Sequence, residues 1–596
     1  MPEINNNSLL IRIFPFLAWL RNYKFSLFKS DLLAGITVAV IILPQSMAYA
    51  LLAGVPPVIG IYSAAITPII AGLWGNLRQL STGPFAILSL LVYTTLSPIA
   101  IPGSHDYLEM AVLLTLIVGG INIFIGLFRL SRFVSFISLS IVKGFTSASA
   151  LIIIGTQLPA LLGIEIKHFQ YFVPTIYNII LDLPKLHVPT FIIGVGSLFL
   201  IIIIRKISTL PSGLFTLIIA TVFTAIFRLD LNGVNIIGQI QPGMPQFVLP
   251  MFDMGTISLL FVPALVMVLI TNVETYSIGK TIAMETKQPL DWNKEFFGQG
   301  LANVVGSFFQ NIPVSASFSR TAVNYKAGAK TAMSSVITGL SVIVVLLFAT
   351  GWLYYVPRAS LAAIVISAVL ILFHPRQIFK LLKKNRDDGI VAISVFILSL
   401  LIKLDYALLI SVSLSLIFFI WKSMHPRIIR VTHALDYKVE INGDALNKPS
   451  CPQIFHIRPD NSVFFVNSEY TVERIREKLE TQASPATKFF ILDFESIAFI
   501  DITAIEEFKL LKAELEAKGI QMVIMNLHIP VEKVFRSTGF IDTFDPKLIF
   551  TNRNELIPKL FEKIDHKYCV EECPYTLFPC CLKIKNEGIT YQDIEE

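Results

Sequence analysis

Long apolar stretches recur along the first two thirds of the chain and determine the expected fold. Residues 32–77 contain no Asp, Glu, Lys or Arg, and residues 207–227 and 331–357 are equally free of charge. A helix of about 20 apolar residues spans the hydrocarbon layer of a bilayer. Only helices and closed barrels satisfy their backbone groups within that layer. The pattern therefore predicts an all-α polytopic membrane domain.

The apolar stretches resolve into fourteen segments. Their approximate bounds are 32–54, 57–75, 84–97, 110–128, 133–160, 189–206, 211–228, 257–285, 293–311, 317–330, 331–351, 356–375, 388–403 and 404–424. Segments 84–97 and 317–330 are short and begin after turn sequences, and each is the third of its seven. Short, interrupted segments at matching positions indicate an inverted-repeat transporter with its site between them. We therefore predict seven plus seven segments.

The pattern changes after residue 430. Residues 437–566 mix charged and apolar positions as a soluble α/β domain does. Residues 488–494 and 520–525 are expected to form buried strands, and residues 504–518 carry apolar side chains at helical spacing. The sequence therefore predicts a β-α-β pattern in a small second domain.

The composition excludes a soluble enzyme. Of the 596 residues, 54% are hydrophobic and 15% are charged, whereas a soluble protein carries about a quarter charged residues. No phosphate-binding loop is present, and the apolar segments hold no metal-binding or nucleophile constellation. We expect no catalytic activity and no cofactor.

The net charge of +6 comes from basic residues that flank the apolar segments, which argues against nucleic-acid binding. The clusters are Arg129 and Arg132; Arg205 and Lys206; Arg376, Lys380, Lys383, Lys384 and Arg386; and Lys422, Arg427 and Arg430. Residues 229–259, by contrast, contain no Lys or Arg. The positive-inside rule places the clusters in the cytoplasm, and an even number of spans then places both termini there.

The N-terminal segment, residues 1–30, does not resemble a cleavable signal. Arg12 interrupts its apolar stretch, and no small-residue cleavage site follows. We interpret Leu9–Leu20 as an amphipathic helix at the membrane surface. The absence of targeting features favours a bacterial inner membrane.

The two short segments begin with sequences suited to an anion. A helix N-terminus offers free N–H groups and about half a positive charge. One segment opens with Gly83-Pro84-Phe85-Ala86, and the other with Ser317-Phe318-Ser319-Arg320. The planar guanidinium suits a tetrahedral oxyanion. The alternative for Arg320 is a helix-end charge that extends to the membrane interface.

Glu274 is the second ionisable residue of interest. It follows a charge-free stretch, residues 254–273, so we expect it near the middle of the membrane. An ionised carboxylate there is costly. Two helix ends and Arg320 supply about +2, which matches a dianion best when Glu274 is protonated. The hypothesis is proton-coupled uptake; the alternative is that Glu274 pairs with Lys280 or Lys287.

Several stretches of the membrane domain carry recognisable sequence motifs. The first span reads DLLAGITVA from Asp31 and LPQSMAYA from Leu43, followed by LLAGVPPVIGIY. The two short segments open with Thr82–Ala86 and Phe318–Tyr325. These stretches resemble the first span and the openings of the two interrupted helices in the SulP family of sulfate permeases, and the resemblance covers nearly the whole chain. It implies a UraA-like fold, in which a core and a gate each draw on both repeats and move in an elevator-like manner.

The resemblance also implies roles for individual residues. Substrate would lie between the two interrupted helices, with Glu274 as the coupling residue. The implied substrate-binding residues are Gln45, Tyr49, Phe85, Ala86, Ser319 and Arg320.

The C-terminal domain resembles the STAS domain, through Leu492–Ala504. In related antagonists this loop carries a phosphorylatable Ser or Thr, and Thr503 occupies that place. Ala504 stands where a Gly usually follows, so a hydroxyl at the helix start is the competing interpretation of Thr503. The expected roles of the domain are dimer assembly and regulation.

A Cys-containing tail, residues 567–596, falls outside the resemblance. Its thiols do not show the paired Cys-x-x-Cys spacing usual for zinc, and we assign no metal ligand. Zinc binding, lipidation and redox-active thiols stay open for the four cysteines Cys569, Cys573, Cys580 and Cys581.

The expected protein is a homodimeric sulfate–proton symporter whose membrane domain covers residues 31–430. Sodium-dependent bicarbonate uptake and proton-linked dicarboxylate uptake are the alternatives within transport. An anion channel or a membrane sensor that signals through the C-terminal domain is the alternative from another class.

Overall fold

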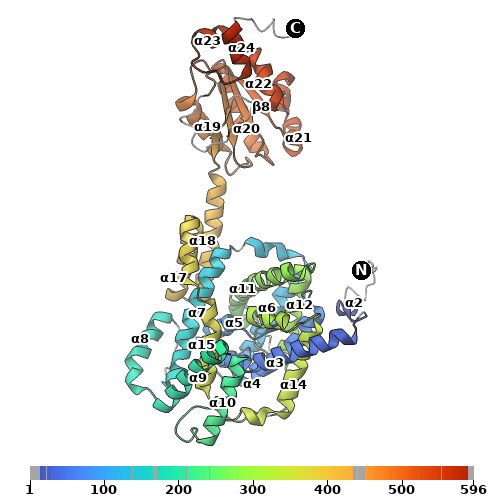
Figure 1. The fold of residues 1–596 in the computed structure, drawn as a ribbon, viewed down its shortest axis with the longest axis vertical. Coiled ribbons are helices and arrows are strands. Elements are labelled where there is room, and N and C mark those ends of the chain that lie inside the picture. Colours follow the sequence, from blue (N-terminus) through green and yellow to red (C-terminus); the bar gives the residue numbers. More distant parts are fainter. Residues whose placement is uncertain are drawn as a thin grey trace. The chain divides into compact units, whose positions relative to one another are not determined.

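The computed structural model describes ten stretches of the chain. They are residues 14–21, 23–136, 138–164, 171–207, 211–240, 242–250, 252–433, 439–440, 450–551 and 553–587. The chain divides into two compact units, Met1–Ser415 and Leu416–Glu596 (Figure 1). The first unit is helical and the second is mixed α/β, as predicted.

The first unit consists mainly of helices, the last of which, α18, extends past Ser415 into the second unit. Its α-helices are α2 (Phe16–Leu20), α3 (Phe25–Leu52), α4 (Pro57–Trp74), α5 (Ala86–Leu96), α6 (His105–Leu127), α7 (Leu139–Leu162), α8 (Phe172–Asp182), α9 (Val188–Ile207), α10 (Ser212–Ile226), α11 (Met254–Thr286), α12 (Trp292–Ser307), α13 (Phe318–Lys326), α14 (Met333–Phe348), α15 (Arg358–Val369), α16 (Pro375–Lys384), α17 (Arg386–Leu401) and α18 (Leu404–Met424). Its 3₁₀ turns are η1 (Leu130–Phe136), η2 (Leu183–Lys185), η3 (Thr350–Leu353) and η4 (Leu370–Leu372).

Each of the fourteen predicted segments corresponds to one helix. Among the described residues, eight spans are long and apolar enough to cross a membrane, one of which combines α15, η4 and α16. Helices α5, α10 and α14 are shorter apolar helices. Two further helices, α8 and α16, were not predicted as segments. Of the predicted N-terminal helix, the described part forms α2, while residues 9–13 lie outside the described residues.

The helix contacts follow a two-fold pattern between the halves. In chain order α3, α4, α5, α6, α7, α9 and α10 correspond to α11, α12, α13, α14, α15, α17 and α18. The pair α6–α12 is then matched by α14–α4, α3–α14 by α11–α6, and α3–α13 by α11–α5. Two further matched pairs are α7–α17 with α15–α9 and α3–α5 with α11–α13. Because seven is odd, the second half is inverted relative to the first.

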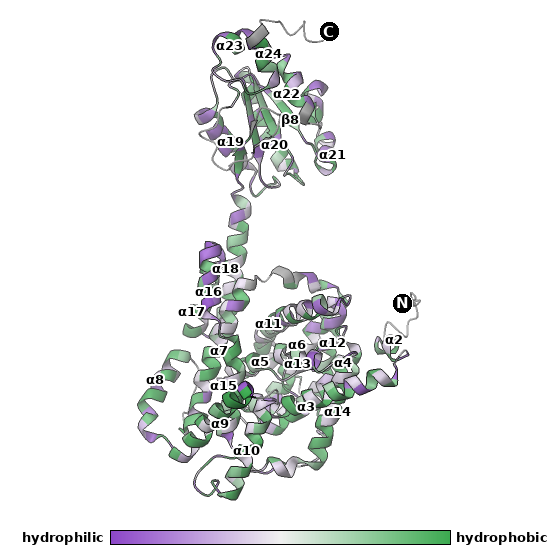
Figure 2. Cartoon of the chain, in the orientation of Figure 1, coloured by the Kyte–Doolittle hydropathy of each residue, from purple (hydrophilic) through white to green (hydrophobic). Residues whose placement is uncertain are grey.

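These contacts separate a core from a gate. The core consists of α3–α6 and α11–α14, and the gate contains α7, α9, α10, α15 and α17. Figure 2 shows hydrophobic residues along the outer helices α8, α9 and α10. Exposed apolar side chains are expected where lipid replaces water.

Glycines allow the core helices to approach closely. A Cβ on Gly60 of α4 would lie 2.0 Å from the Ser46 carbonyl oxygen of α3. A Cβ on Gly300 of α12 would lie 2.8 Å from the Gly119 carbonyl oxygen of α6. Small residues at helix contacts are typical of membrane bundles.

The second unit contains a five-stranded sheet in the order β3-β6-β7-β8-β9. β3 pairs with β6 in the antiparallel direction, and the other pairs are parallel. The strands are β3 (Ile428–Arg430), β4 (Thr432–His433), β5 (Val439–Glu440), β6 (Ile454–Pro459), β7 (Phe489–Asp493), β8 (Gln521–Met525) and β9 (Ile549–Phe550). The helices and turns are α19 (Ser468–Gln482), α20 (Ile502–Ala517), α21 (Ile529–Ser537), η5 (Ile541–Thr543), η6 (Pro546–Leu548), α22 (Arg553–Phe561), α23 (His566–Glu571) and α24 (Pro579–Glu587).

Both faces of this sheet are buried. Phe490 and Leu492 belong to one apolar cluster, and Phe489 and Ile491 belong to another. Successive strand residues point to opposite faces, so an apolar run is needed when helices cover both faces.

The described part of the expected tail belongs to this second apolar cluster. Phe578, Cys581 and Ile584 of the tail pack with the strand residues Val523 and Met525. The structure thus extends the α/β domain past residue 566, the boundary predicted from the sequence. Apolar residues show no clear helical spacing in the sequence of the short helices α23 and α24.

Candidate functional site

A short strand pair brings the two interrupted segments together. β1 (Thr82–Gly83) precedes α5, and β2 (Ser315–Ala316) precedes α13. The strands pair antiparallel, with Thr82 opposite Ala316 and Gly83 opposite Ser315. Residues more than 200 positions apart therefore place the starts of both short helices side by side.

Polar side chains from neighbouring helices fix the strand before α13. The Asn303 side chain accepts a hydrogen bond from the Val314 N–H (2.9 Å) and donates to its carbonyl (3.2 Å). Ser63 accepts from the Ile312 N–H, and Thr115 donates to the Asn311 carbonyl. Non-helical backbone within a membrane requires such partners.

A buried carboxylate fixes the loop before α5. Glu295 of α12 accepts hydrogen bonds from the Asn76 N–H (2.8 Å) and the Leu77 N–H (2.9 Å). Its other oxygen accepts from the Gln299 amide, which also donates to Thr82 Oγ1 (2.8 Å). The chain Glu295–Gln299–Thr82 thus links α12 to β1.

The starts of both short helices keep free N–H donors. Within the described residues, no side chain forms a capping hydrogen bond at Phe85, the N-cap of α5, and Ala86 opens the helix. Ser317, at the N-cap of α13, makes no capping bond; its hydroxyl lies 3.3 Å from that of Ser319. Uncapped first turns are ready sites for an anion.

Arg320 lies between the two helix starts. Its side chain is 1% exposed. Nη1 donates to the Pro84 carbonyl (3.0 Å) and to Gln45 Oε1 (3.4 Å). Nε and Nη2 have no hydrogen-bond partner among the described residues. The guanidinium is therefore buried at this junction and does not extend to the interface.

Gln45 and Tyr49 come from α3, one turn apart on the same face. Tyr49 is buried and lies close enough to Arg320 and Glu274 for electrostatic interaction. Gly83 permits the close approach of α3, because a Cβ there would lie 2.7 Å from Ile42 Cδ1 and 3.4 Å from Arg320 Nη2.

Glu274, in the middle of α11, lines a cavity of about 150 Å³. Core helices α11 and α13 and gate helix α7 contribute its walls, together with Leu372 of η4 and Leu408 of α18. Glu274 Oε2 has no hydrogen-bond partner in the described part of the chain. The alternative pairing with Lys280 is not seen, because that ammonium lies over the Tyr276 ring.

The structure therefore gathers the predicted membrane residues around one junction. The residues that support it were not predicted from the sequence; they are chiefly Asn303, Glu295 and Gln299. Asp31 is another: it accepts hydrogen bonds from the Lys330 and Thr331 N–H groups before α14. Isolated polar residues inside apolar segments were the available signal.

Comparison with known proteins agrees with this architecture. Residues 28–395 match the sulfate permease family, and residues 445–556 match the STAS domain. The chain belongs to the sulfate permease family.

Relatives of this permease-family chain include two plant proteins. Sulfate transporter 4.1, chloroplastic, of Arabidopsis thaliana is 32% identical over 566 residues, which cover 91% of this chain and 82% of the relative. High affinity sulfate transporter 1 of Stylosanthes hamata is 31% identical over 542 residues, which cover 86% and 81%. The chain is accordingly a multi-pass membrane transporter and not an enzyme.

Two solved structures share its fold at 22% identity. The murine Slc26a9 anion transporter in the inward-facing state has a TM-score of 0.84 and covers 94% of this chain and 96% of its own. The transmembrane domain of the cyanobacterial bicarbonate transporter BicA has a TM-score of 0.58 and covers 66% and 98%.

In the STAS domain of this permease, Thr503 lies at the start of α20. It is exposed in the first turn of α20, and Asp501 caps that helix by accepting from the Ala504 N–H (2.9 Å). The hydroxyl of Thr503 is therefore not the cap.

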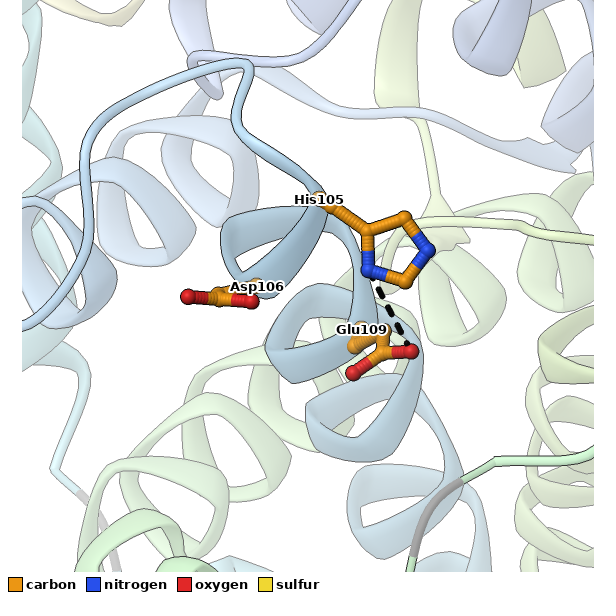
Figure 3. A group of neighbouring side chains, drawn as sticks. All are labelled: His105, Asp106 and Glu109. Atoms are coloured by element: carbon orange, nitrogen blue, oxygen red, sulfur yellow. Dashed lines mark ion pairs between the residues drawn. The ribbon is translucent and has the colours of Figure 1, made fainter.

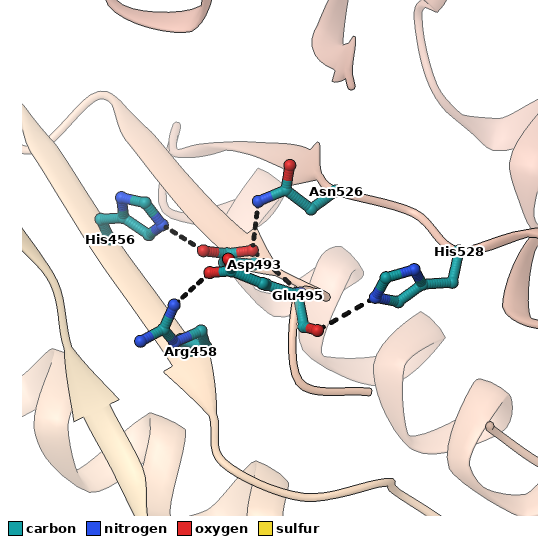
Figure 4. A network of polar contacts seen from close by, with 6 residues as sticks. All are labelled: His456, Arg458, Asp493, Glu495, Asn526 and His528. Carbon is teal, nitrogen blue, oxygen red and sulfur yellow. Dashed lines mark hydrogen bonds and ion pairs between the residues drawn. The ribbon is translucent and has the colours of Figure 1, made fainter. Parts of the chain in front are cut away.

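A polar network lies at the carboxyl ends of the parallel strands (Figure 4). Asp493, fully buried, accepts from the Asn526 amide (2.9 Å) and lies 3.5 Å from His456. Arg458 pairs with Glu495. This network ties β6, β7 and β8 together.

Four of the five cysteines line one small cavity of about 10 Å³: Cys451, Cys569, Cys573 and Cys581. Burial raises the pKa of Cys451 to about 12 and that of Cys569 to about 11. Neutral thiols of this kind act as small apolar side chains.

Among the described residues, one group of side chains has ligand atoms close enough together to hold a metal ion. Ligand atoms of His105, Asp106 and Glu109 lie within 4.8 Å of one another at the start of α6 (Figure 3). His105 pairs with Glu109 at 3.4 Å and is 84% exposed. The group is a solvated ion pair at a helix start, where the dipole disfavours a cation. The cysteine thiols of the described residues do not form a group of three ligands this close together.

Proposed function

We propose that this protein transports sulfate across a membrane and binds it between the starts of α5 and α13. The observation that carries the proposal is the buried guanidinium of Arg320, whose Nε and Nη2 have no partner among the described residues. A buried charge without sufficient partners is costly. An oxyanion at the junction would supply the missing acceptors.

The charge at the junction supports a dianion. Each uncapped helix start carries about half a positive charge, and Arg320 adds one. The hydroxyls of Ser317 and Ser319 lie beside these donors. The sulfate transporters among the relatives agree with a tetrahedral oxyanion.

We propose that a proton accompanies the anion and binds Glu274. This carboxyl group lies near Arg320 and Tyr49, and its Oε2 lacks a partner in the described chain. An ionised Glu274 would lower the positive charge that the dianion meets. Protonation therefore strengthens sulfate binding, and an acidic exterior favours uptake.

The arrangement of core and gate supports alternating access in which the two parts move against each other. Because the cavity beside Glu274 is walled by both parts, such a movement would open or close it. The basic clusters favour cytoplasmic termini, and a homodimer is our expectation for the assembly.

Uptake into proteoliposomes tests the proposal. Labelled sulfate is offered with competing bicarbonate or dicarboxylate, with and without sodium, across a range of external pH. The account predicts saturable sulfate uptake that acid stimulates and sodium does not affect. Arg320→Gln should strongly reduce uptake at low sulfate concentration, whereas Arg358→Gln, at the exposed start of α15, serves as the matched control. Preference for bicarbonate with sodium would overturn the assignment.

A further inference from the structure

A strongly basic surface lies on α16 and the start of α17. It consists of Arg376, Lys380, Lys383, Lys384 and Arg386, all exposed. In the described part of the chain, none of these five side chains forms an ion pair or hydrogen bond. The neighbouring acid Asp388 accepts a hydrogen bond from the Asn385 side chain. We call these five residues the α16 basic surface.

The chain connectivity places α16 at a membrane face. The helix has ten residues and lies between α15 and α17, which correspond to the twelfth and thirteenth apolar segments. Its two sides differ: Ile378 is buried against the protein, whereas the cations face outward. In Figure 2 the α16 region is coloured hydrophilic beside apolar neighbours.

An apolar side chain accompanies the cations. Phe379 is 62% exposed and lies one turn before Lys383 on the helix. A basic amphipathic helix with an exposed aromatic residue is typical of binding to a membrane surface. A soluble anion or an acidic peptide would account for the cations but would leave Phe379 in water.

We propose that the α16 basic surface binds the headgroups of anionic phospholipids. The ammonium and guanidinium groups would pair with lipid phosphates, and Phe379 would enter the boundary between headgroups and acyl chains. Each Lys or Arg near an anionic membrane surface strengthens binding, and the contributions sum within about a Debye length.

Lipid held at this surface would act on the gate. A Cβ on Gly389 of α17 would lie 2.2 Å from Leu382 Cα, so α16 packs directly on α17. α17 packs equally closely on α7, since a Cβ on Gly144 would lie 2.3 Å from the Ala392 carbonyl oxygen. α7 in turn forms a wall of the cavity that contains Glu274. Anionic lipid is therefore expected to stabilise the gate helices and to raise the transport rate.

The test uses the full-length protein in vesicles of phosphatidylcholine alone or mixed with phosphatidylglycerol. The variant Lys380→Gln/Lys383→Gln/Lys384→Gln is compared with a control that loses the same charge at exposed positions of the STAS domain. The control is Lys518→Gln/Lys533→Gln/Lys547→Gln. Phosphatidylglycerol retained by the purified protein is measured by lipid mass spectrometry, and initial uptake is measured in both vesicle types.

The α16 variant should bind phosphatidylglycerol on the order of a hundredfold more weakly than the wild type, and the control should bind it normally. Stimulation of uptake by phosphatidylglycerol should disappear in the α16 variant alone, with uptake in phosphatidylcholine unchanged. Unchanged lipid retention would overturn the proposal. An equal loss of uptake in phosphatidylcholine would also overturn it, because the surface would then serve folding or attract the transported anion. Lipid retention does not depend on which anion is carried.

Discussion

Replacing Arg320 by Gln is the sharpest perturbation of the proposed anion site. Gln keeps a polar side chain at the start of α13 but removes the charge and the planar fork. In the native structure Nη1 is occupied by the Pro84 carbonyl and Gln45. Nε and Nη2 are the atoms left for an anion.

The expected loss follows from burial and charge. A hydrogen bond to a charged group contributes about 1.5–3 kcal/mol. Two unit charges about 4 Å apart interact by about 4 kcal/mol at an effective dielectric constant of about 20. We expect Arg320→Gln to weaken sulfate binding by about 3 kcal/mol, which is roughly a hundredfold rise in Kd. Arg320→Lys keeps the charge but loses the planar fork, so its Kd for sulfate should lie between those of the wild type and Arg320→Gln.

Binding of labelled sulfate to the purified variants measures this effect. Thermal unfolding of each variant shows whether the fold is intact, and Arg358→Gln is the matched control for loss of a positive charge. A folded Arg320→Gln protein that binds sulfate with the native Kd would refute the reasoning.

Four other changes test the coupling residue, the supporting contacts of the site and the buried thiols. Glu274→Gln should make sulfate uptake independent of an imposed proton gradient, because the side chain then stays neutral at every pH; a persisting dependence would contradict the coupling role. Glu295→Ala leaves two loop N–H groups without their acceptor and should lower stability by about 2–4 kcal/mol, seen as a lower Tm. Gly83→Ala should reduce uptake with little change in expression, since the added Cβ would lie 2.7 Å from Ile42 Cδ1 and so disturb the packing of α3 on the site; normal uptake would show that the close approach is unnecessary. Cys451 and Cys569 should react slowly with iodoacetamide at neutral pH, because their raised pKa values leave little thiolate; fast labelling of the folded protein, followed by mass spectrometry, would argue against burial.

The segments of the membrane domain were predictable because lipid imposes a simple pattern. A charge-free run as long as residues 331–357 is typical of a membrane-spanning helix, and it became α14 and the turn after it. Helices α8 and α16 were missed because each has only about ten residues and alternates apolar with polar or charged positions. Short surface helices resemble loops in such a pattern.

The candidate site was predictable only in part. The short segments and Arg320 were visible as breaks and an isolated charge. The direction of the guanidinium, toward the Pro84 carbonyl of the other half, depends on a contact across 236 positions. The role of Glu295 likewise depends on N–H groups 218 and 219 positions away. Local patterns carry no information about such pairs.

A structure of the protein with bound selenate, located by its anomalous scattering, tests the central claim most directly. The account predicts the ion between the starts of α5 and α13, with oxygens about 2.7–3.2 Å from N–H groups of both helices and beside Arg320 Nε or Nη2. An ion found elsewhere, with the guanidinium unchanged and the helix starts empty, would contradict the account.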